Sequence, residues 1–253
     1  MKIAVLAQDS ASTWMMVNAL RANCPEVSVM IEQPVSRQVL LRRRAARLGL
    51  WPVFGQVLFM ALVPLLGAAA RRRRDELITA EGLCTERPAG LAINECQSVN
   101  SPECIAWLRA LRPDVVVVNG TRIISAATLS ASDAIILNTH CGITPAYRGV
   151  HGGYWALYCN DAANAGVTVH LVNSGIDTGD IVYQQSISVD AHDNFVTYPV
   201  KQYAAGVPLM LKAVSDVAAG RLRTFKREDL LSALWHHPTL WQYLSARLFR
   251  GVR

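Results

Sequence analysis

A short polar run and an acidic turn carry the residue types that could do acid–base chemistry. Asn138, Thr139 and His140 follow an apolar stretch, and Asp177 lies 37 residues after His140 in the turn Gly175–Asp180. If the extended backbone continues through the polar run, Asn138 and His140 face the same side, because side chains alternate along a strand. An amide N–H and an imidazole on one face can stabilise an oxyanion and transfer a proton. A turn cap beside a packed histidine is the other interpretation of the same pattern.

The segments near the N-terminus predict the opening of an α/β sheet. The apolar run Ile3–Ala7 is typical of a buried strand, a helix is expected through Trp14–Leu20, and Val27–Ile31 predicts a second strand. This order is typical of a doubly wound sheet, in which ligands bind at the carboxyl ends of the strands.

The same alternation resumes in the second half of the chain. Ser101-Pro102 is typical of a helix start, and the run Val115–Val118 is typical of a parallel strand buried on both faces. Further strands are predicted at Leu91–Ile93, Ala134–Leu137, Val167–Val172 and Ile181–Ser186, and a long helix over Thr197–Ala219. We therefore expect Asn138 and His140 at the carboxyl end of a buried strand.

Composition limits the class of protein. Hydrophobic residues make up 51% of the 253 residues and charged residues 17%, which excludes a disordered chain. The net charge of +6 suggests a polyanionic partner. However, nine arginines lie between Gln33 and Arg74 without an acidic residue, and the rest of the chain has a net charge of −3. Six cysteines without a C-x-x-C pair and an N-terminal apolar run too short for a signal peptide predict a cytoplasmic protein with reduced thiols.

The arginine-rich region interrupts the α/β pattern. Leu48–Ala70 is uncharged for 23 residues, which is long enough to cross a bilayer, but Pro52, Pro64 and Gln56 weaken it as a spanning helix. We expect residues 36–74 to form an inserted helical segment. It would lie on an anionic membrane surface, at the inner face of the membrane, or pack in a homodimer interface.

Several motifs occur in order between Arg112 and Ile181. They are Arg112-Pro-Asp-Val-Val-Val-Val-Asn-Gly-Thr-Arg-Ile-Ile-Ser125, Leu137-Asn-Thr-His140, Pro145-Ala-Tyr-Arg-Gly149 and Gly175-Ile-Asp-Thr-Gly-Asp-Ile181. Together they resemble the folate-dependent formyltransferase superfamily, which includes glycinamide ribonucleotide, methionyl-tRNA and sugar N-formyltransferases. The resemblance is loose over residues 1–30 and absent over 36–74. It implies an α/β, Rossmann-like, doubly wound and mostly parallel sheet, here with an inserted arginine-flanked apolar helical segment and a short C-terminal helical tail.

The resemblance also implies roles for individual residues. Asn138, His140 and Asp177 match the catalytic residues of the family, and His170 matches a histidine that lies near the catalytic aspartate. The formyl donor would be 10-formyltetrahydrofolate, and its pocket would involve two stretches of this chain, Arg122, Ile123 and Ile124, and Ser174, Gly175 and Ile176. Asn138 and protonated His140 would donate to the developing oxyanion, and Asp177 would orient His140 and favour its charged form.

Two absences narrow the acceptor within the resemblance. Gln8–Thr13 contains no glycine, although the ribonucleotide enzymes bind a phosphate with a glycine-rich loop there. The tRNA enzymes carry a further domain, whereas about thirty residues follow Gly220 here, so nucleic acid is not expected as a partner. A small-molecule amine remains, with a nucleotide-linked amino sugar as the preferred acceptor. A 10-formyltetrahydrofolate hydrolase and a membrane-associated binding or scaffold protein are the alternatives.

The expected organisation is a catalytic domain over 1–220, with the insertion at 36–74, and a helical tail over 221–253. Cys141 is expected to be a packing residue rather than a nucleophile. His151 is expected to contact the acceptor or to form a tight turn, Arg148 to have a structural role, and His236-His237 to lack a third metal ligand.

Overall fold

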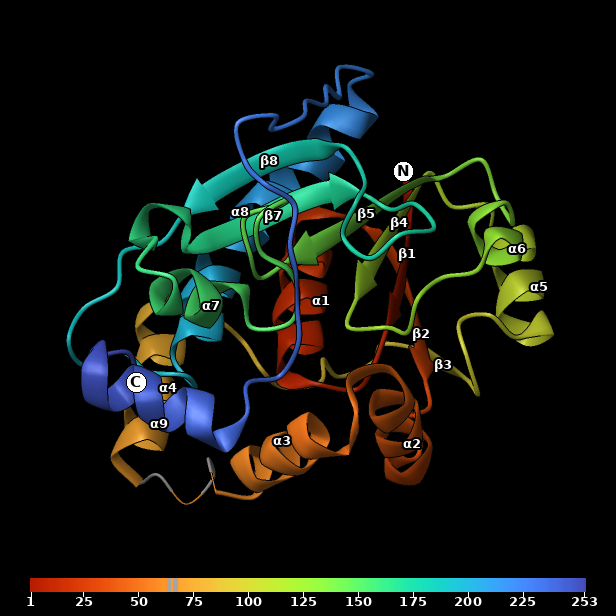
Figure 1. Cartoon of the computed structure of the whole chain (residues 1–253). Coiled ribbons are helices and arrows are strands. Elements are labelled where there is room, and N and C mark those ends of the chain that lie inside the picture. The colour runs from red at the N-terminus through yellow and green to blue at the C-terminus, as the bar shows by residue number, and fades with distance from the viewer. Residues whose placement is uncertain (63–64, 66–67) are drawn as a thin grey trace.

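The computed structural model describes residues 1–62, 65 and 68–253, and its centre is a seven-stranded sheet (Figure 1). The strand order is β3-β2-β1-β4-β5-β7-β8, in which the first five strands are parallel and β7 and β8 are antiparallel. The strands are β1 (Lys2–Ala7), β2 (Glu26–Glu32), β3 (Ile93–Cys96), β4 (Val115–Asn119), β5 (Ile135–His140), β7 (Gly166–Leu171) and β8 (Ile181–Ser186). The predicted Rossmann-like, mostly parallel sheet is confirmed.

Alternating side chains of the strands supply two separate cores. Ile3 and Val5 of β1 pack with α1 (Ala11–Asn23) and α8 (Tyr198–Ala218) on one face of the sheet. Ala4 and Leu6 point to the other face and pack with α5 (Pro102–Leu111). The period of two along each strand therefore buries both faces, which explains why these strands are apolar throughout.

Most of the predicted element positions agree with the structure. Ser101 caps α5 by accepting the backbone N–H of Cys104, as its place before Pro102 predicts. The strand expected at Leu91–Ile93 was wrong, because the structure begins β3 at Ile93 and pairs Ile93–Cys96 with Val29–Glu32. β3 contains the polar residues Asn94 and Glu95, so it does not form an apolar run in the sequence. Its backbone N–H and C=O groups form hydrogen bonds with β2, which makes it a strand.

The arginine-rich region forms three helices. They are α2 (Arg37–Leu48), α3 (Leu50–Leu62) and α4 (Ala68–Ala80), so the helical segment extends beyond the predicted end at residue 74. Among the described residues, no helix is long and apolar enough to cross a membrane. Within the apolar segment Leu48–Ala70, Pro64 and three neighbouring positions (63, 66 and 67) lie outside the described residues.

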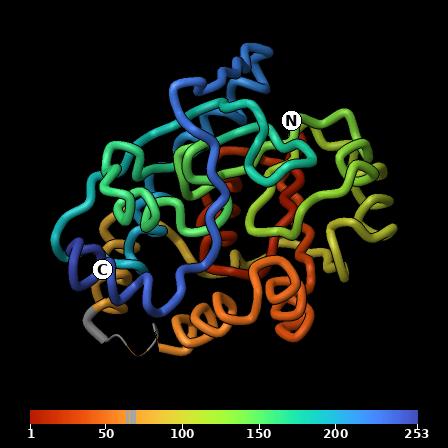
Figure 2. Tube along the Cα trace, viewed as in Figure 1, coloured from red at the N-terminus to blue at the C-terminus, as the bar shows by residue number. Residues whose placement is uncertain are grey.

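The tail after α8 crosses the front of the molecule and is helical only near its end (Figure 2). Phe225 bridges Ile181, and β9 (Leu234–Trp235) pairs with β6 (Arg148–Gly149) before α9 (Leu240–Phe249) begins. The expected helical tail over 221–253 is therefore corrected to an extended segment, residues 221–239, followed by one helix. We call this extended segment the strap. The strap satisfies its backbone by pairing, and this brings His236 and His237 over the sheet.

The remaining helices are short. They are α6 (Ala126–Leu129), α7 (Gly152–Tyr158) and the 3-10 helix η2 (Ala162–Asn164). A third core joins α7, α9 and α8 through aromatic side chains, including Tyr154, Trp155 and Tyr243. This cluster fixes the strap and the loop after β5 against the sheet, next to the predicted catalytic residues.

Candidate active site

Asn138 and His140 lie at the carboxyl end of β5, as the sequence predicts. Val118 of β4 pairs with Asn138 on one side of β5, and His170 of β7 pairs with Asn138 on the other. β7 runs antiparallel to β5 and ends at Leu171, opposite Leu137, so the turn to β8 begins beside β5 and not beyond His140. The turn folds back toward the carboxyl end of β5, because Asp177 within it lies 3.4 Å from His140 and 3.6 Å from His170.

The His140 ring has one nitrogen committed to the backbone and one facing Asp177. Nε2 lies 2.7 Å from the carbonyl oxygen of Tyr147, which can only accept, so Nε2 carries a proton. Nδ1 lies 3.4 Å from Asp177 Oδ2, which is longer than an ordinary hydrogen bond. Nδ1 is therefore a base when the ring is neutral and a donor when it is charged, and it is available to a substrate atom.

Asp177 is held as a carboxylate. Its Oδ2 accepts the backbone N–H of Gly149 at 2.9 Å, and its Oδ1 lies 3.6 Å from His170 Nε2. Burial alone would raise the pKa of Asp177, but His140, His170 and the Gly149 N–H outweigh burial and lower it to about 2. The backbone of Asp177 has φ of 50°, a left-handed conformation that is uncommon outside glycine. Aspartate and asparagine adopt this conformation more readily than other residues with a side chain.

His170 fixes the amide of Asn138. The nitrogen Nδ1 of His170 lies 2.7 Å from the carbonyl oxygen of Leu171 and donates to it, so Nε2 is an acceptor while the ring is neutral and a donor toward Asp177 while the ring is charged. Asn138 Nδ2 lies 3.1 Å from this Nε2, so one amide hydrogen of Asn138 points toward His170. The second amide hydrogen has no acceptor among the described residues. His170 also lies beside Asp177, as the family resemblance implies, and contributes a second function that the sequence did not show.

Gly142 leaves the space that His140 needs. A Cβ on Gly142 would lie 2.6 Å from His140 Nε2 and 2.2 Å from the Tyr147 carbonyl oxygen, the two atoms of one hydrogen bond. These distances are below those of real Cβ contacts, so only glycine permits this packing. Cys141, next to it, is a poor nucleophile, because burial and Asp177 raise the pKa of its thiol to about 12.

The predicted catalytic residues line a cavity of about 720 Å³ between β5, the β7–β8 turn and the inserted helix α2. This volume is in the range of ligand sites. Of the predicted donor-pocket residues, Arg122, Ile123, Ile124, Gly175 and Ile176 also line it. Ser174 is exposed and does not line this cavity in the described structure.

Arg122 lines the cavity, and its side chain forms an ion pair with Glu32. The guanidinium of Arg122 lies 2.8 Å from the buried Glu32 carboxylate, and its Nη2 donates to the Gln33 carbonyl oxygen at 2.6 Å. Glu32 also accepts the backbone N–H groups of Arg122 and Val99. Glu32 therefore positions the loop after β4, a role that the sequence could not indicate because Glu32 and Arg122 are 90 residues apart.

The opposite wall comes from the insertion and the strap. Arg44, Arg47, His151 and His237 line the cavity there, and His151 Nε2 lies 2.9 Å from His237 Nδ1. Burial, His237 and Arg44 lower the pKa of His151 to about 3, and burial and Arg44 lower that of His237 to about 4. The histidines are therefore neutral near pH 7, and the arginines supply the positive charge of this wall.

His151 lines the cavity and forms the expected tight turn at the start of α7, where its φ is 59°. Its contact with an acceptor stays a prediction. Arg148 has the expected structural role, because its Nη1 donates to the Ile176 carbonyl oxygen at 3.0 Å and holds the turn that carries Asp177. Among the described residues, no group of three or more His, Cys, Asp or Glu side chains is placed to hold a metal ion.

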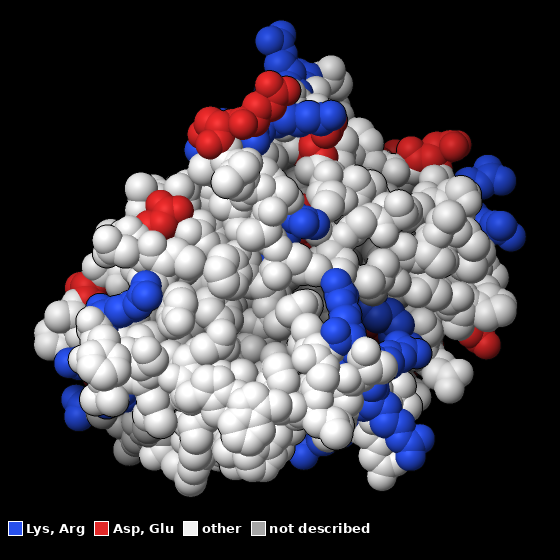
Figure 3. Space-filling model, in the orientation of Figure 1, with Lys and Arg blue, Asp and Glu red and all other residues white. Residues whose placement is uncertain are grey.

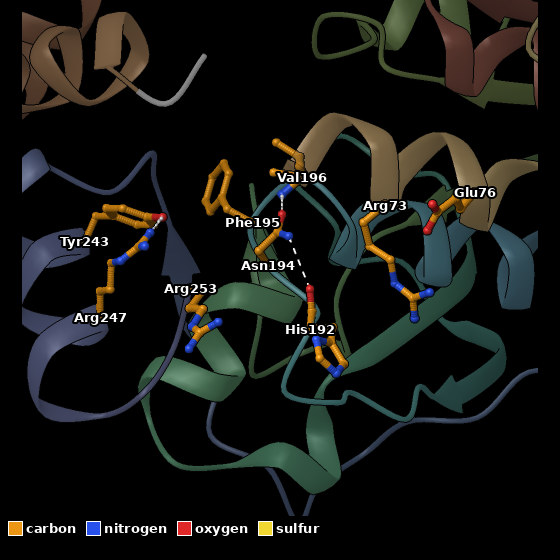
Figure 4. Close-up of a pocket in the computed structure, with 10 residues that line it drawn as sticks. Arg73, Glu76, His192, Asn194, Phe195, Val196, Tyr243, Arg247 and Arg253 are labelled. Carbon is orange, nitrogen blue, oxygen red and sulfur yellow. Dashed lines mark hydrogen bonds between the residues drawn. The ribbon is translucent and has the colours of Figure 1, made fainter. Parts of the chain in front are cut away.

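A second cavity, of about 510 Å³, lies between α4, α9 and the loop before α8. Its lining includes Arg73, His192, Phe195, Arg247 and Arg253 (Figure 4). None of the predicted site residues lines it, and Arg73 is paired with Asp190 at 3.5 Å. We therefore place the candidate active site in the larger cavity.

Comparison with known proteins agrees with this constellation. The model of the formyl transferase family matches residues 68–214, more than half of the chain. This chain belongs to the formyl transferase family. Its relatives include methionyl-tRNA formyltransferases of Chlorobium chlorochromatii (29% identical over 143 residues) and Pseudomonas paraeruginosa (31% over 148 residues). The matches cover 56% and 58% of this chain but 45% and 47% of those proteins, so the chain spans about half of their length.

Solved formyltransferases share the fold at low sequence identity. A sugar N-formyltransferase from Shewanella aligns with a TM-score of 0.59 and 14% identity, over 99% of this chain and 87% of that one. Glycinamide ribonucleotide transformylase 1 from Symbiobacterium toebii has a TM-score of 0.59 and 21% identity, over 93% and 94%. An N-formyltransferase from Helicobacter canadensis in complex with folinic acid and dTDP-3-aminofucose has a TM-score of 0.58 and 15% identity, over 93% and 70%.

Proposed function

We propose that this protein transfers the formyl group of 10-formyltetrahydrofolate to the primary amine of a nucleotide-linked amino sugar. The observation that carries the proposal is the convergence of Asn138, His140 and Asp177 in one cavity, within a chain of the formyl transferase family. The sugar N-formyltransferase fold neighbours support a sugar acceptor, and the methionyl-tRNA formyltransferase relatives keep tRNA as the acceptor to be tested against it.

The cavity fits a formyl donor with a flat ring. The lining includes the apolar side chains of Val118, Ile124 and Val172 together with the polar residues Asn138 and His140. A mostly apolar cavity with a few polar groups is the usual form of a site for such a ligand. The donor supplies the carbonyl carbon that the amine attacks.

The chain's own residues would stabilise charge and hold the transferred proton. The second N–H of Asn138 and the Nδ1–H of charged His140 would donate to the formyl oxygen as it gains negative charge. Asp177, ionised above a pKa of about 2, would keep His140 oriented and accept the amine proton through a water. The new N–C bond forms at the amine, the old one breaks at the folate nitrogen, and one proton moves from the first nitrogen to the second.

The second wall of the cavity supports an acceptor with a phosphate. Arg44 and Arg47 line the cavity and, among the described residues, neither is within ion-pair distance of a carboxylate. Arginine binds phosphate oxygens with its planar set of donors. These two side chains therefore favour a nucleotide-linked amine over an uncharged one.

The test is formyl transfer from 10-formyltetrahydrofolate to a panel of nucleotide-linked amino sugars, with methionyl-tRNA and an amine-free reaction beside it. We expect amine-dependent turnover that falls at least about 100-fold in Asn138→Ala and His140→Ala. Arg44→Ala and Arg47→Ala should raise KM for the acceptor more than they lower kcat, whereas the exposed Arg43→Ala should not.

Three results would contradict the proposal. Equal folate turnover without amine would show a hydrolase, and efficient formylation of methionyl-tRNA would show that the acceptor is wrong. A folded protein that binds the folate but formylates no member of the panel would show a binding protein of the same fold.

A further inference from the structure

The helices α3 and α9 expose apolar side chains in two adjoining rows. On α3, Leu50, Trp51 and Phe54 are 79%, 68% and 53% exposed, while Val53, Gln56 and Phe59 on the opposite side are buried. The spacing of the exposed row follows the helical period, so it is one face of the helix. An exposed face of a surface helix is normally polar, and this one is not.

The same pattern occurs on α9. Trp241, Leu244 and Leu248 are 36%, 44% and 73% exposed at positions i, i+3 and i+7, while Tyr243 and Ala246 face the core. The rings of Trp51 and Trp241 stack with their centroids 4.9 Å apart, so the two rows form one continuous surface. We call this surface the apolar face, made of Leu50, Trp51, Phe54, Trp241, Leu244 and Leu248.

Arginines border the apolar face, and no acid lies among them. The helices α2, α3 and α9 contain no Asp or Glu, while α2 alone has five arginines and no buried residue. In Figure 3 the surface over α3 is almost entirely uncharged, and Lys and Arg gather over α2 beside it. The arginines of α4 differ, because Arg72, Arg73 and Arg74 are paired with Glu76, Asp190 and Asp75.

This combination selects among possible partners. A symmetric dimer through the apolar face would bring the two sets of α2 arginines toward each other without an acid to neutralise them, which is unfavourable. An anionic bilayer instead provides hydrocarbon for the tryptophans, leucines and phenylalanine and negative headgroups for the arginines. Tryptophan is also enriched at the membrane–water boundary.

We propose that the apolar face and the α2 arginines dock the protein peripherally on an anionic lipid bilayer. The docking helices also border the active-site cavity, since α2 contributes Arg44, Arg47 and Leu48 to its wall. A docked molecule therefore holds this cavity near the bilayer surface. The docking does not depend on the proposed reaction, because the face and the catalytic residues use different side chains.

The test is co-sedimentation of the full chain with vesicles of phosphatidylcholine alone and with 30% phosphatidylglycerol, at about 0.1 M and 0.5 M salt. We expect binding to the anionic vesicles that weakens at high salt. Arg42→Gln with Arg43→Gln should reduce partitioning about 30-fold, because each arginine near an anionic surface contributes about fivefold. Both positions are exposed and lie outside the cavity lining.

A second variant tests the apolar contribution. Trp51→Ser with Phe54→Ser should lower binding to anionic vesicles with little change in salt dependence, because it removes buried area and no charge. The matched controls are Arg109→Gln with Arg223→Gln, two exposed arginines on other surfaces, and Leu231→Ser, an apolar side chain that is 91% exposed in the strap. All variants should keep the wild-type thermal midpoint and, where the acceptor is known, the wild-type formyl transfer.

The outcomes separate the partners. Loss of binding in the face variants with retention in the controls supports docking on the bilayer. Absence of wild-type binding to anionic vesicles would overturn it, as would equal loss in the control variants. A dimer in light scattering that the Trp51→Ser, Phe54→Ser variant dissociates, without vesicle binding, would overturn it in favour of a second copy of the chain.

Discussion

The charge of Asp177 should stabilise the folded protein as well as support catalysis. Its pKa falls from 3.8 to about 2 on folding, which corresponds to about 2 kcal/mol of unfolding free energy at neutral pH. The side chain is 14% exposed, so solvent screens this contribution only partly. Because the folded-state pKa is the lower one, this stability is present above about pH 4 and is lost as the pH falls toward 2.

Asp177→Asn isolates the charge. Asparagine has the same shape and tolerates a left-handed backbone, so φ of 50° adds little strain. We expect the variant to unfold at lower urea concentration at pH 6, by about 2 kcal/mol, and about half of this difference to remain at pH 3. Formyl transfer should fall at least about 100-fold at every pH, because the carboxylate that orients His140 is missing.

Asp177→Ala provides the comparison for the backbone. Alanine loses the charge and also pays for the left-handed conformation, so it should be about 1 kcal/mol less stable than Asp177→Asn at all pH values. Urea unfolding monitored by tryptophan fluorescence, from pH 3 to pH 7, measures both differences. A gap between wild type and Asp177→Asn that does not change over this range would refute the electrostatic argument.

Three further substitutions or reactions test the surroundings of the site. Gly142→Ala should lower kcat strongly while the sheet remains folded, because its Cβ would displace either His140 or the Tyr147 carbonyl, and wild-type kcat would contradict this packing. Glu32→Ala should destabilise the protein by about 3–5 kcal/mol in urea unfolding, because it removes the carboxylate that pairs with the Arg122 guanidinium and leaves two backbone N–H groups without their acceptor, and a loss below about 1 kcal/mol would argue against that role. Cys141 should react with Ellman's reagent far more slowly than the exposed Cys84 at pH 7.5, since the pKa of its thiol is about 12, and mass spectrometry of the labelled protein would reveal equal rates.

Local pattern was sufficient to predict the strand that carries the site. The valine run at Val115–Val118 and the apolar run before Asn138 both form buried parallel strands. The period of two predicted Asn138 and His140 on one side of β5, and both line the cavity at the end of that strand, as does Thr139 between them. These features depend on neighbours in sequence, which is why one sequence shows them.

The contacts that orient these residues could not be predicted in the same way. His170 meets Asn138 through the register of an antiparallel pair, and that register is set by the length and geometry of the intervening chain. Glu32 reaches Arg122 across 90 residues, and His237 reaches His151 across 86. Each pair provides a hydrogen-bond partner for a polar group whose burial would otherwise cost free energy. These pairs form only when the chain folds, so they depend on tertiary packing.

The nine arginines of the insertion show how composition can mislead when it is not divided by location. As one group they suggested a single basic feature, but the structure places eight of them in three different environments. Arg44 and Arg47 line the active-site cavity, Arg72–Arg74 are paired with acids, and Arg37, Arg42 and Arg43 are exposed on α2. A helix that lines the cavity on one side and is exposed on the other can bind the phosphate of an acceptor and the headgroups of a bilayer with different side chains. Substitutions at Arg44 and at Arg42 should therefore separate acceptor KM from vesicle binding in the same protein.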